Sequence, residues 1–282
     1  MNTKPILQQY KQFKSFFIGV PGFVWQVLFF YVPLLCIIGL SFSGATWFSN
    51  FAPFFRASYF TVIGRSLFLA TLNATLCTLI AYPLAYFLAF RAGRMKMLLL
   101  FLVILPFWNN FLVHIYAWTF VLDHQGIINT FLLQTHLIDQ PIHFLNSFPA
   151  VVVMMVYFYM PFMILPLYAA LERFDRRLIE ASLDLGATWW GTMRHVLIPL
   201  SMPGIRTGFF LVFIPSFGEF IIPEFMGGNK NMYVGTVVSD FILGTQTIGQ
   251  GAAFTIISSC ALVVVAGLLY LVLSRTKCLV KG

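Results

Sequence analysis

"EASLDLGATWWGTMRHVLIPLSMPG", residues 180–204, is a polar, patterned stretch in a chain that is otherwise strongly apolar. It combines two acids, an arginine, three glycines and two tryptophans, and long apolar segments lie on either side of it. The whole chain is 60% hydrophobic and only 9% charged, whereas a soluble domain carries roughly 25% charged residues. The composition therefore predicts an all-α integral membrane protein in which this stretch is a loop outside the membrane.

The loop has the pattern of two short helices joined by a turn. From Arg177 to Leu185, small and apolar residues recur on one face and charged residues on another. Gly186 is suited to end this helix, and the residues from Trp189 onward predict a second, interfacial helix running to Pro199. Two interpretations are open: a helix–turn–helix that meets a partner, or an amphipathic loop lying on the lipid surface.

Six segments reach or approach the length of about 20 mostly apolar residues that a membrane-spanning helix needs. They lie at about 16–42, 62–90, 97–122, 148–171, 206–227 and 252–274, within a single domain over residues 1–282. The fifth is the weakest, because prolines, a glycine and two acids interrupt it. The first follows three lysines but is far longer than the apolar core of a signal peptide, so we expect it to remain as an uncleaved span.

The positive charge predicts the orientation of these spans. All but three of the 17 lysines and arginines lie before span 1, between spans 2 and 3, between spans 4 and 5, or after span 6; the exceptions are Arg56, Arg65 and Lys230. Because positive loops stay in the cytoplasm, both termini and the loop 172–205 are expected there. The net charge of +8 is therefore a topology signal, and we expect no nucleic-acid partner.

Neither the cysteines nor the histidines and acids of the loop 123–147 predict a functional site. The four cysteines, Cys36, Cys77, Cys260 and Cys278, lie in apolar runs or a basic tail, so we expect no disulfide framework. The outward loop 123–147 holds three histidines and two acids, but their spacing matches no compact metal-ligand pattern. We expect no metal site there, and a solvated or partner-facing loop instead.

The loop after span 4 resembles the EAA loop of bacterial ABC importer permeases. Glu180-Ala181-Ser182, three residues, Gly186, nine residues and then Val196-Leu197-Ile198-Pro199 follow that family's pattern of Glu-Ala-Ala, three residues, Gly, nine residues and Ile-x-Leu-Pro. The chain departs from it at Ser182, Val196 and Ile198, all with residues of similar size. The resemblance implies the type I ABC importer permease fold, and a coupling helix that docks in a groove of a separate cytoplasmic ATPase subunit.

The same resemblance assigns roles to residues of the loop. The implied ATPase-coupling residues are Glu180, Ala181, Ser182, Gly186 and Pro199. The chain contains no Gly-x-x-x-x-Gly-Lys-Ser/Thr phosphate loop, so we expect no ATP hydrolysis by this chain and no cofactor in it. ATP and magnesium would be bound by the partner subunit.

Two stretches resemble, more narrowly, the B-type permeases of spermidine/putrescine importers. They are "LLLFLVILPFWNNFLVHIYAW" (98–118) and "FIPSFGEFIIPEFMGGNKNMYVG" (213–235). This resemblance implies a polyamine importer in the bacterial inner membrane. It also implies a second permease subunit, two ATPase subunits and an extracytoplasmic substrate-binding protein as partners.

The residues of these stretches suit a flexible polycation, which needs acids, polar acceptors and aromatic faces along its path. The predicted path residues are Trp108, Asn109, Asn110, Tyr116 and Trp118 of span 3, after Pro106, and Glu219 and Glu224 of span 5. Alternatives are open for both groups. The tryptophans also fit interface anchors or packing residues, and the acids also fit hydrogen bonds to neighbouring helices or places at the outer interface. We expect His114 to be a helix-packing group.

Three other functions compete with that of a polyamine permease. A permease for another small solute, such as molybdate, sulfate, thiamine or ferric iron, has the same loop, although acids in span 5 disfavour oxyanions. An ion-coupled secondary transporter using Glu219 and Glu224 as proton carriers often shows repeated halves, which are not visible here. A membrane enzyme would need a convergent catalytic set, and no nucleophile or metal motif is present.

Overall fold

The structure is a computed structural model that describes residues 20–44, 48–228, 231–244 and 247–275. Within these ranges the secondary structure is helical, without strands. We predicted one domain over residues 1–282; the contacts group the chain into two compact units, one of residues 1–56 with 240–257, the other of residues 57–239 with 258–282. The larger unit carries all the predicted site residues.

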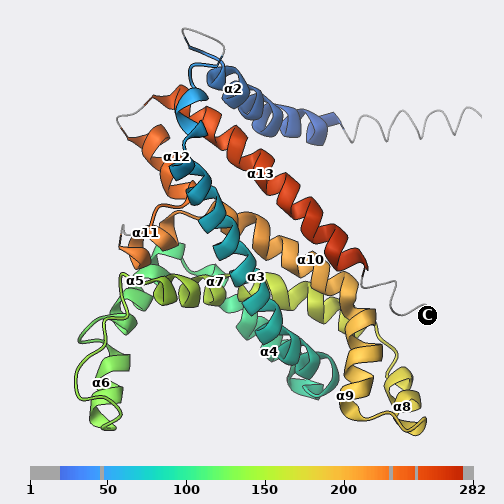
Figure 1. Cartoon of the computed structure of the whole chain (residues 1–282). Coiled ribbons are helices and arrows are strands. Elements are labelled where there is room, and N and C mark those ends of the chain that lie inside the picture. The colour runs from blue at the N-terminus through green and yellow to red at the C-terminus, as the bar shows by residue number, and fades with distance from the viewer. Residues whose placement is uncertain (1–19, 45–47, 229–230, 245–246, 276–282) are drawn as a thin grey trace, which may run out of the picture. The chain divides into compact units, whose positions relative to one another are not determined.

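Three long helices form the centre of the larger unit. They are α3 (Ala57–Phe90), α7 (Phe148–Glu172) and α10 (Ile198–Phe217), and each packs against the other two (Figure 1). On α3 many of the fully buried side chains are small, namely Ala70, Ala74, Cys77, Ala81 and Ala85, and they alternate with larger ones such as Leu69 and Leu88. Small side chains let membrane helices approach closely, because lipid offers no hydrophobic drive to hold them together.

The contact between α10 and α7 depends on two glycines, Gly204 and Gly208, one turn apart. A Cβ atom at Gly204 would lie 2.5 Å from the Cβ atom of Ala170, and one at Gly208 would lie 2.5 Å from the sulfur of Met163. Those distances are shorter than van der Waals contact, so the two backbones meet where side chains are absent. A polar contact adds to this packing: Asn73 Nδ2 of α3 donates to Ser216 Oγ of α10 at 2.8 Å.

The third predicted span, 97–122, is broken rather than straight. Helix α4 (Lys96–Ile104) passes into a short 3-10 turn, Leu105–Trp108, and α5 (Phe111–Leu122) starts after two non-helical residues. The helical segments on either side of the break make an angle of 96°. Pro106 cannot donate a backbone hydrogen bond, and the Asn110 side chain accepts one from the Leu112 amide and so caps α5.

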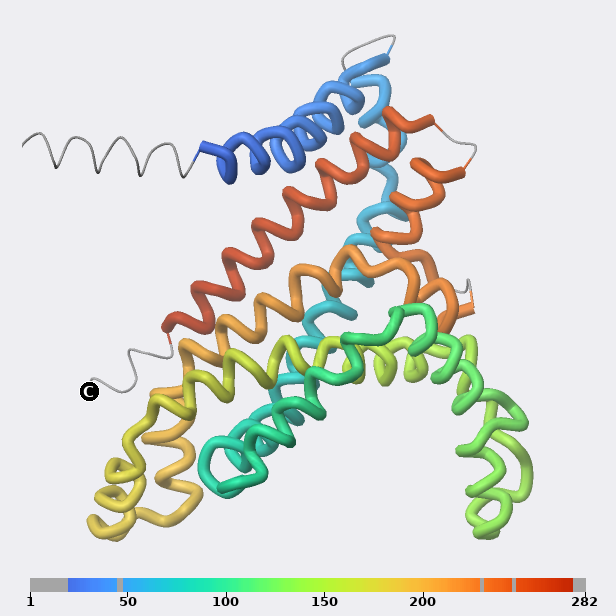
Figure 2. Tube along the Cα trace, turned by 180° about the vertical axis from the view of Figure 1, so that it is seen from behind, coloured from blue at the N-terminus to red at the C-terminus, as the bar shows by residue number. Residues whose placement is uncertain are grey.

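The fifth span differs from its prediction at both ends. We expected the loop's second helix to stop at Pro199 and a span over 206–227. Instead α9 (Trp189–Thr192) continues through a π-helical turn, Met193–Leu197, into α10 as one continuous 29-residue helical run, which bends between α9 and α10 (Figure 2). The helix ends at Phe217, and α11 (Ile221–Gly227) follows a break. Pro199 does not end the helix because it follows directly on the π-helical turn, where the regular i→i−4 hydrogen-bond ladder is already interrupted.

The loop 123–147, which is predicted to face outward, contains α6 (Ile127–Gln134) and is organised by Asn129. This fully buried side chain donates to the carbonyls of Asp123 and Ile142 and accepts from the Ile142 amide. No group of three His, Cys, Asp or Glu side chains placed to hold a metal ion occurs among the described residues.

The smaller unit is built around aromatic side chains. Phe54 packs against Phe241, near the end of α12 (Val234–Leu243), and Phe254, in the first part of α13 (Ile248–Arg275), with ring centroids 5.5 and 5.0 Å apart. The first apolar helix, Val20–Ser41, includes α2 (Val32–Ser41). Five helices of the described chain are long and apolar enough to cross a membrane, and the broken pair around Asn109 makes six.

Candidate cargo groove and coupling loop

A charged side chain lies at a break in the helices of the larger unit, where α10 ends. The chain leaves the helix at Gly218, passes through Glu219 and Phe220, and enters α11. Within a membrane, non-helical backbone is tolerated where it is buried in protein or lines a cavity. The break therefore marks a place where this chain turns polar groups toward something other than lipid.

The carboxylate of Glu219 is held by three neutral donors. Tyr159 donates from its hydroxyl to Oε2 at 2.9 Å, and the amides of Ile221 and Ile222 donate to Oε1 at 3.0 and 3.5 Å. The side chain is half-buried. Among the described residues the one ion pair joins Lys96 to Glu172, so the charge of Glu219 has no cationic partner there.

A groove of about 370 Å³ opens beside this carboxylate. It is lined by Phe111, Phe158, Tyr159, Pro215, Gly218, Glu219, Phe220 and Ile221. Four of these eight residues are aromatic, and the faces of aromatic rings attract cations by about 0.5–2 kcal/mol each. A carboxylate at one point of an aromatic groove is an arrangement that binds an organic ammonium group.

A second pocket of about 120 Å³ adjoins the groove and is lined by Pro106, Phe107, Asn109, Phe111, His114, Tyr157, Phe158 and Pro161. The two share Phe111 and Phe158, whose ring centroids lie 4.6 Å apart. His114 contacts the Pro106 carbonyl oxygen through Nε2 at 2.8 Å and the Tyr157 hydroxyl through Nδ1 at 3.1 Å. The packing role predicted for His114 is confirmed.

The structure brings only part of the predicted path together. Glu219 lines the groove and Asn109 lines the adjoining pocket, whereas Trp108, Tyr116, Trp118 and Glu224 line neither. Trp108 is 72% exposed and packs on Phe101, Tyr116 is 59% exposed, and Glu224 lies exposed on α11. These residues stand on the outer surface of the described chain.

Trp118 and Asn110 have local partners instead. The ring of Trp118 packs on Tyr157, with centroids 5.4 Å apart, and Asn110 caps α5. The residues that sequence reasoning missed are Phe111, Phe158 and Tyr159. The available signal was the run Tyr157-Phe158-Tyr159, in which two phenols lie in the middle of an apolar span.

The loop 172–205 has the predicted helix–turn–helix form. Helix α8 (Arg177–Asp184) ends before Gly186, whose φ of +82° lies in the left-handed region that favours glycine. Thr188 then caps α9, because its hydroxyl accepts from the Gly191 amide at 3.2 Å. The turn expected at Gly186 is confirmed, and Pro199 lies inside the continuous helix beyond it.

The two helices of the loop are joined by hydroxyl groups, because Ser182 Oγ of α8 and Thr192 Oγ1 lie 3.0 Å apart. Ser182 therefore faces α9, while Glu180 and Ala181 are exposed on the other side of α8. Leu185, at the tip of the loop, is 88% exposed. The exposed residues of α8 and of the turn after it are thus partly charged and partly small or apolar.

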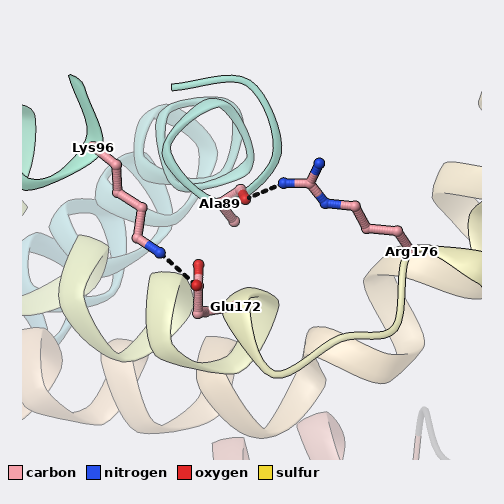
Figure 3. A network of polar contacts seen from close by, with 4 residues as sticks. All are labelled: Ala89, Lys96, Glu172 and Arg176. Carbon is pink, nitrogen blue, oxygen red and sulfur yellow. Dashed lines mark hydrogen bonds and ion pairs between the residues drawn. The ribbon is translucent and has the colours of Figure 1, made fainter. Parts of the chain in front are cut away.

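The root of the loop is tied to two other helices (Figure 3). Lys96, at the start of α4, forms an ion pair with Glu172, at the end of α7. Arg176 donates from Nη2 to the Ala89 carbonyl oxygen of α3 at 3.1 Å and covers the ring of Phe90 at 5.6 Å. These contacts therefore connect the root of the loop to α3, α4 and α7.

Comparison with known proteins agrees with this arrangement. Residues 81–277 match the family described as "Binding-protein-dependent transport system inner membrane component". The spermidine/putrescine transport system permease protein PotB of Escherichia coli (strain K12) is 38% identical over 262 residues, which are 90% of this chain and 94% of that protein. The chain belongs to the PotB-like permeases of this family. The match extends beyond the coupling loop to nearly the whole permease.

Solved structures give the fold of this permease. A bacterial ABC transporter involved in importing the acidic polysaccharide alginate matches with a TM-score of 0.73 at 16% identity, covering 99% of this chain and 100% of that one. A bacterial alginate ABC transporter in complex with an alginate pentasaccharide-bound periplasmic protein matches with a TM-score of 0.72 at 16% identity, covering 99% of this chain and 98% of that one. The all-α type I ABC permease fold predicted from the sequence is confirmed, and this permease is a multi-pass inner membrane protein.

Proposed function

We propose that this chain is the transmembrane permease subunit of an ATP-driven polyamine importer and forms part of the path for spermidine or putrescine. PotB relatives that bear the names of these substrates support the proposal. The observation that carries it is the Glu219 carboxylate, which lies at an aromatic groove without a cationic partner in the described chain. A cargo ammonium group would supply the missing positive charge.

Chemistry favours a cation over the other solutes. Two unit charges about 4 Å apart attract by up to about 4 kcal/mol at an effective dielectric constant near 20, before desolvation is counted. An oxyanion would meet repulsion of similar size. Aromatic rings beside the carboxylate would cover the methylene spacers of a polyamine and attract its charged ends. Trp108, Tyr116, Trp118 and Glu224 remain predicted contacts for other stages of the passage.

The coupling loop supports an ATPase outside this chain. We propose that the exposed face of α8, with Glu180 and Ala181, docks in a groove of a cytoplasmic ATPase subunit, while Ser182, Gly186 and Pro199 shape the loop that presents it. ATP and magnesium would be bound by two such subunits, and a second permease and an extracytoplasmic binding protein would complete the importer. The alginate transporter, whose structure includes a substrate-bound periplasmic protein, supports the last of these partners.

The orientation follows from the charges of the sequence. We propose that both termini and the loop 172–205 are cytoplasmic, since the positive residues cluster on that side. The lysines near the termini and Lys230 lie outside the described residues. This orientation puts α8 on the side where ATP is available.

The test is uptake of labelled putrescine and spermidine by the assembled importer with Glu219→Gln in this subunit. Glutamine keeps the size of the side chain and removes one negative charge. We expect uptake to fall several-fold, while assembly and basal ATP hydrolysis stay near normal. Asp139→Asn, an equivalent change at an exposed acid of the outward loop, is the matched control and should have no effect.

Three results would contradict the proposal. Unchanged uptake kinetics for both polyamines in the Glu219→Gln, Glu224→Gln double variant would reject a charge-guided path through this part of the chain. Uptake of an uncharged or anionic solute with the same dependence on Glu219 would assign the permease to another cargo. Uptake that needs no ATPase subunit would favour the secondary-transporter alternative.

A further inference from the structure

The segment that leads into α12 is pinned to α3 by a buried hydrogen bond. Ser66 Oγ accepts from the Val234 amide at 2.8 Å, and Ser66 is only 1% exposed. Tyr233 and Val234 are buried as well. Because an unpaired buried amide is costly, this bond fixes the height of the segment along α3.

The next residue, Gly235, lies directly against the break that carries Glu219. A Cβ atom at Gly235 would lie 2.9 Å from both the carbonyl carbon and the carbonyl oxygen of Glu219, and closer still to the carbonyl oxygen of Gly218. These neighbours are backbone atoms, which cannot rotate away as a flexible side chain can. Gly235 is therefore needed for space, since any side chain there would displace the Gly218–Glu219 peptide.

The carboxylate of Glu219 is thus constrained from two directions. Tyr159 and the Ile221 amide hold its oxygens, while Gly235 sets where the backbone beneath it lies. We propose that Gly235 is a positioning residue for the Glu219 carboxylate, with Ser66 as the anchor that holds Gly235 in place. The proposal rests on the proposed role of Glu219 in cargo passage and adds a determinant of cargo affinity that lies outside the groove lining.

The experiment compares Gly235→Ala with Gly64→Ala in the assembled importer. Gly64 is the matched control, because it lies two residues before Ser66 on α3 and a Cβ atom there meets nothing within 4 Å. We expect Gly235→Ala to raise the KM for putrescine and spermidine several-fold with a much smaller change in kcat. Gly64→Ala should leave both values within twofold of the wild type.

A double-mutant cycle with Glu219→Gln separates positioning from general damage. If Gly235 acts through Glu219, then adding Gly235→Ala to Glu219→Gln should change KM by less than twofold, because the charge to be positioned is already gone. If the two effects multiply, Gly235 acts independently of Glu219 and the proposal is overturned.

Ser66→Ala provides a milder variant should Gly235→Ala fail to assemble. It removes the acceptor of the Val234 amide without adding atoms, and we expect a smaller rise in KM that also vanishes in the Glu219→Gln background. A rise that persists there would overturn the proposal. Unchanged uptake with Glu219→Gln alone would instead refute the proposed cargo role. Impaired uptake with Glu219→Gln together with normal uptake in the Gly235→Ala variant would refute only the positioning role.

Discussion

The hydroxyl of Tyr159 donates a hydrogen bond to Oε2 of Glu219, so α7 holds the carboxylate at the break between α10 and α11. The two residues lie 60 positions apart in the chain. Helix α7 therefore orients the Glu219 carboxylate, which lies just past the end of α10.

Replacing Tyr159 by phenylalanine should weaken cargo capture without removing the charge. A hydrogen bond to a charged group contributes about 1.5–3 kcal/mol, and Glu219 is half-buried, so water replaces part of the lost bond. We expect a KM for polyamine uptake that is roughly two- to tenfold higher. Tyr157→Phe is the control, because Tyr157 contacts His114 rather than Glu219. Equal losses in both variants would argue against the Tyr159–Glu219 contact as the cause.

Gly186 offers a backbone test of the coupling loop. A φ of +82° costs a residue other than glycine about 1–2 kcal/mol, and a β-branched residue more. We expect Gly186→Val to insert in the membrane normally but to lose uptake and cargo-stimulated ATP hydrolysis. Gly186→Asn should retain much of both, since asparagine tolerates this conformation. Normal uptake with valine would count heavily against the docking role of the turn.

The ion pair at the root of the loop predicts a charge-reversal effect. Lys96→Glu or Glu172→Lys alone places two like charges together where α4 meets α7 (Figure 3). We expect each single variant to lower cargo-stimulated ATP hydrolysis, and the double reversal to restore most of it. The pair is partly exposed, so raising the salt concentration should reduce the difference between single and double variants. A double variant as impaired as the worse single variant would show that the attraction is not what matters.

The predicted orientation is open to chemical labelling. Single cysteines near Gln125 and Asn229, in a background without the native cysteines, should react with membrane-impermeant reagents applied from outside the cell. Cysteines near Lys96, Arg176 and Lys281 should react only after the membrane is opened. Asn229 and Lys281 lie outside the described residues, so the labelling expected there is predicted from the charge pattern of the sequence alone. Reversed labelling would refute both the orientation and the cytoplasmic place of α8.

The membrane helices and the helix–turn–helix form of the loop could be predicted from the sequence. The run of apolar residues is enough to predict the membrane helices, and the Gly186 turn follows from a glycine placed just past an amphipathic segment. The two-helix form of the loop follows from the same pattern. Each of these depends on neighbours a few residues away.

The features that the sequence did not reveal depend on distant partners or on the membrane setting. Pro199 looked like a helix end, yet it lies inside the continuous helix Trp189–Phe217, directly after the π-helical turn that interrupts the regular hydrogen-bond ladder. Ser182 looked like a small docking residue, yet it faces Thr192. The groove combines Phe111, Phe158 and Glu219 from three parts of the chain. The hydropathy of the sequence does not predict that these residues lie close together.

The loop and the groove lie at the two ends of one continuous helical run, Trp189–Phe217, which bends between α9 and α10 (Figure 2). Its longer part, α10, has 20 residues and extends over about 30 Å at 1.5 Å per residue. If α10 moved as a rigid rod, a tilt of about 10° about its first turn would shift the end beside Glu219 by about 5 Å. The stiffness of the π-helical turn Met193–Leu197 would then set how much of a movement of the loop reaches that end.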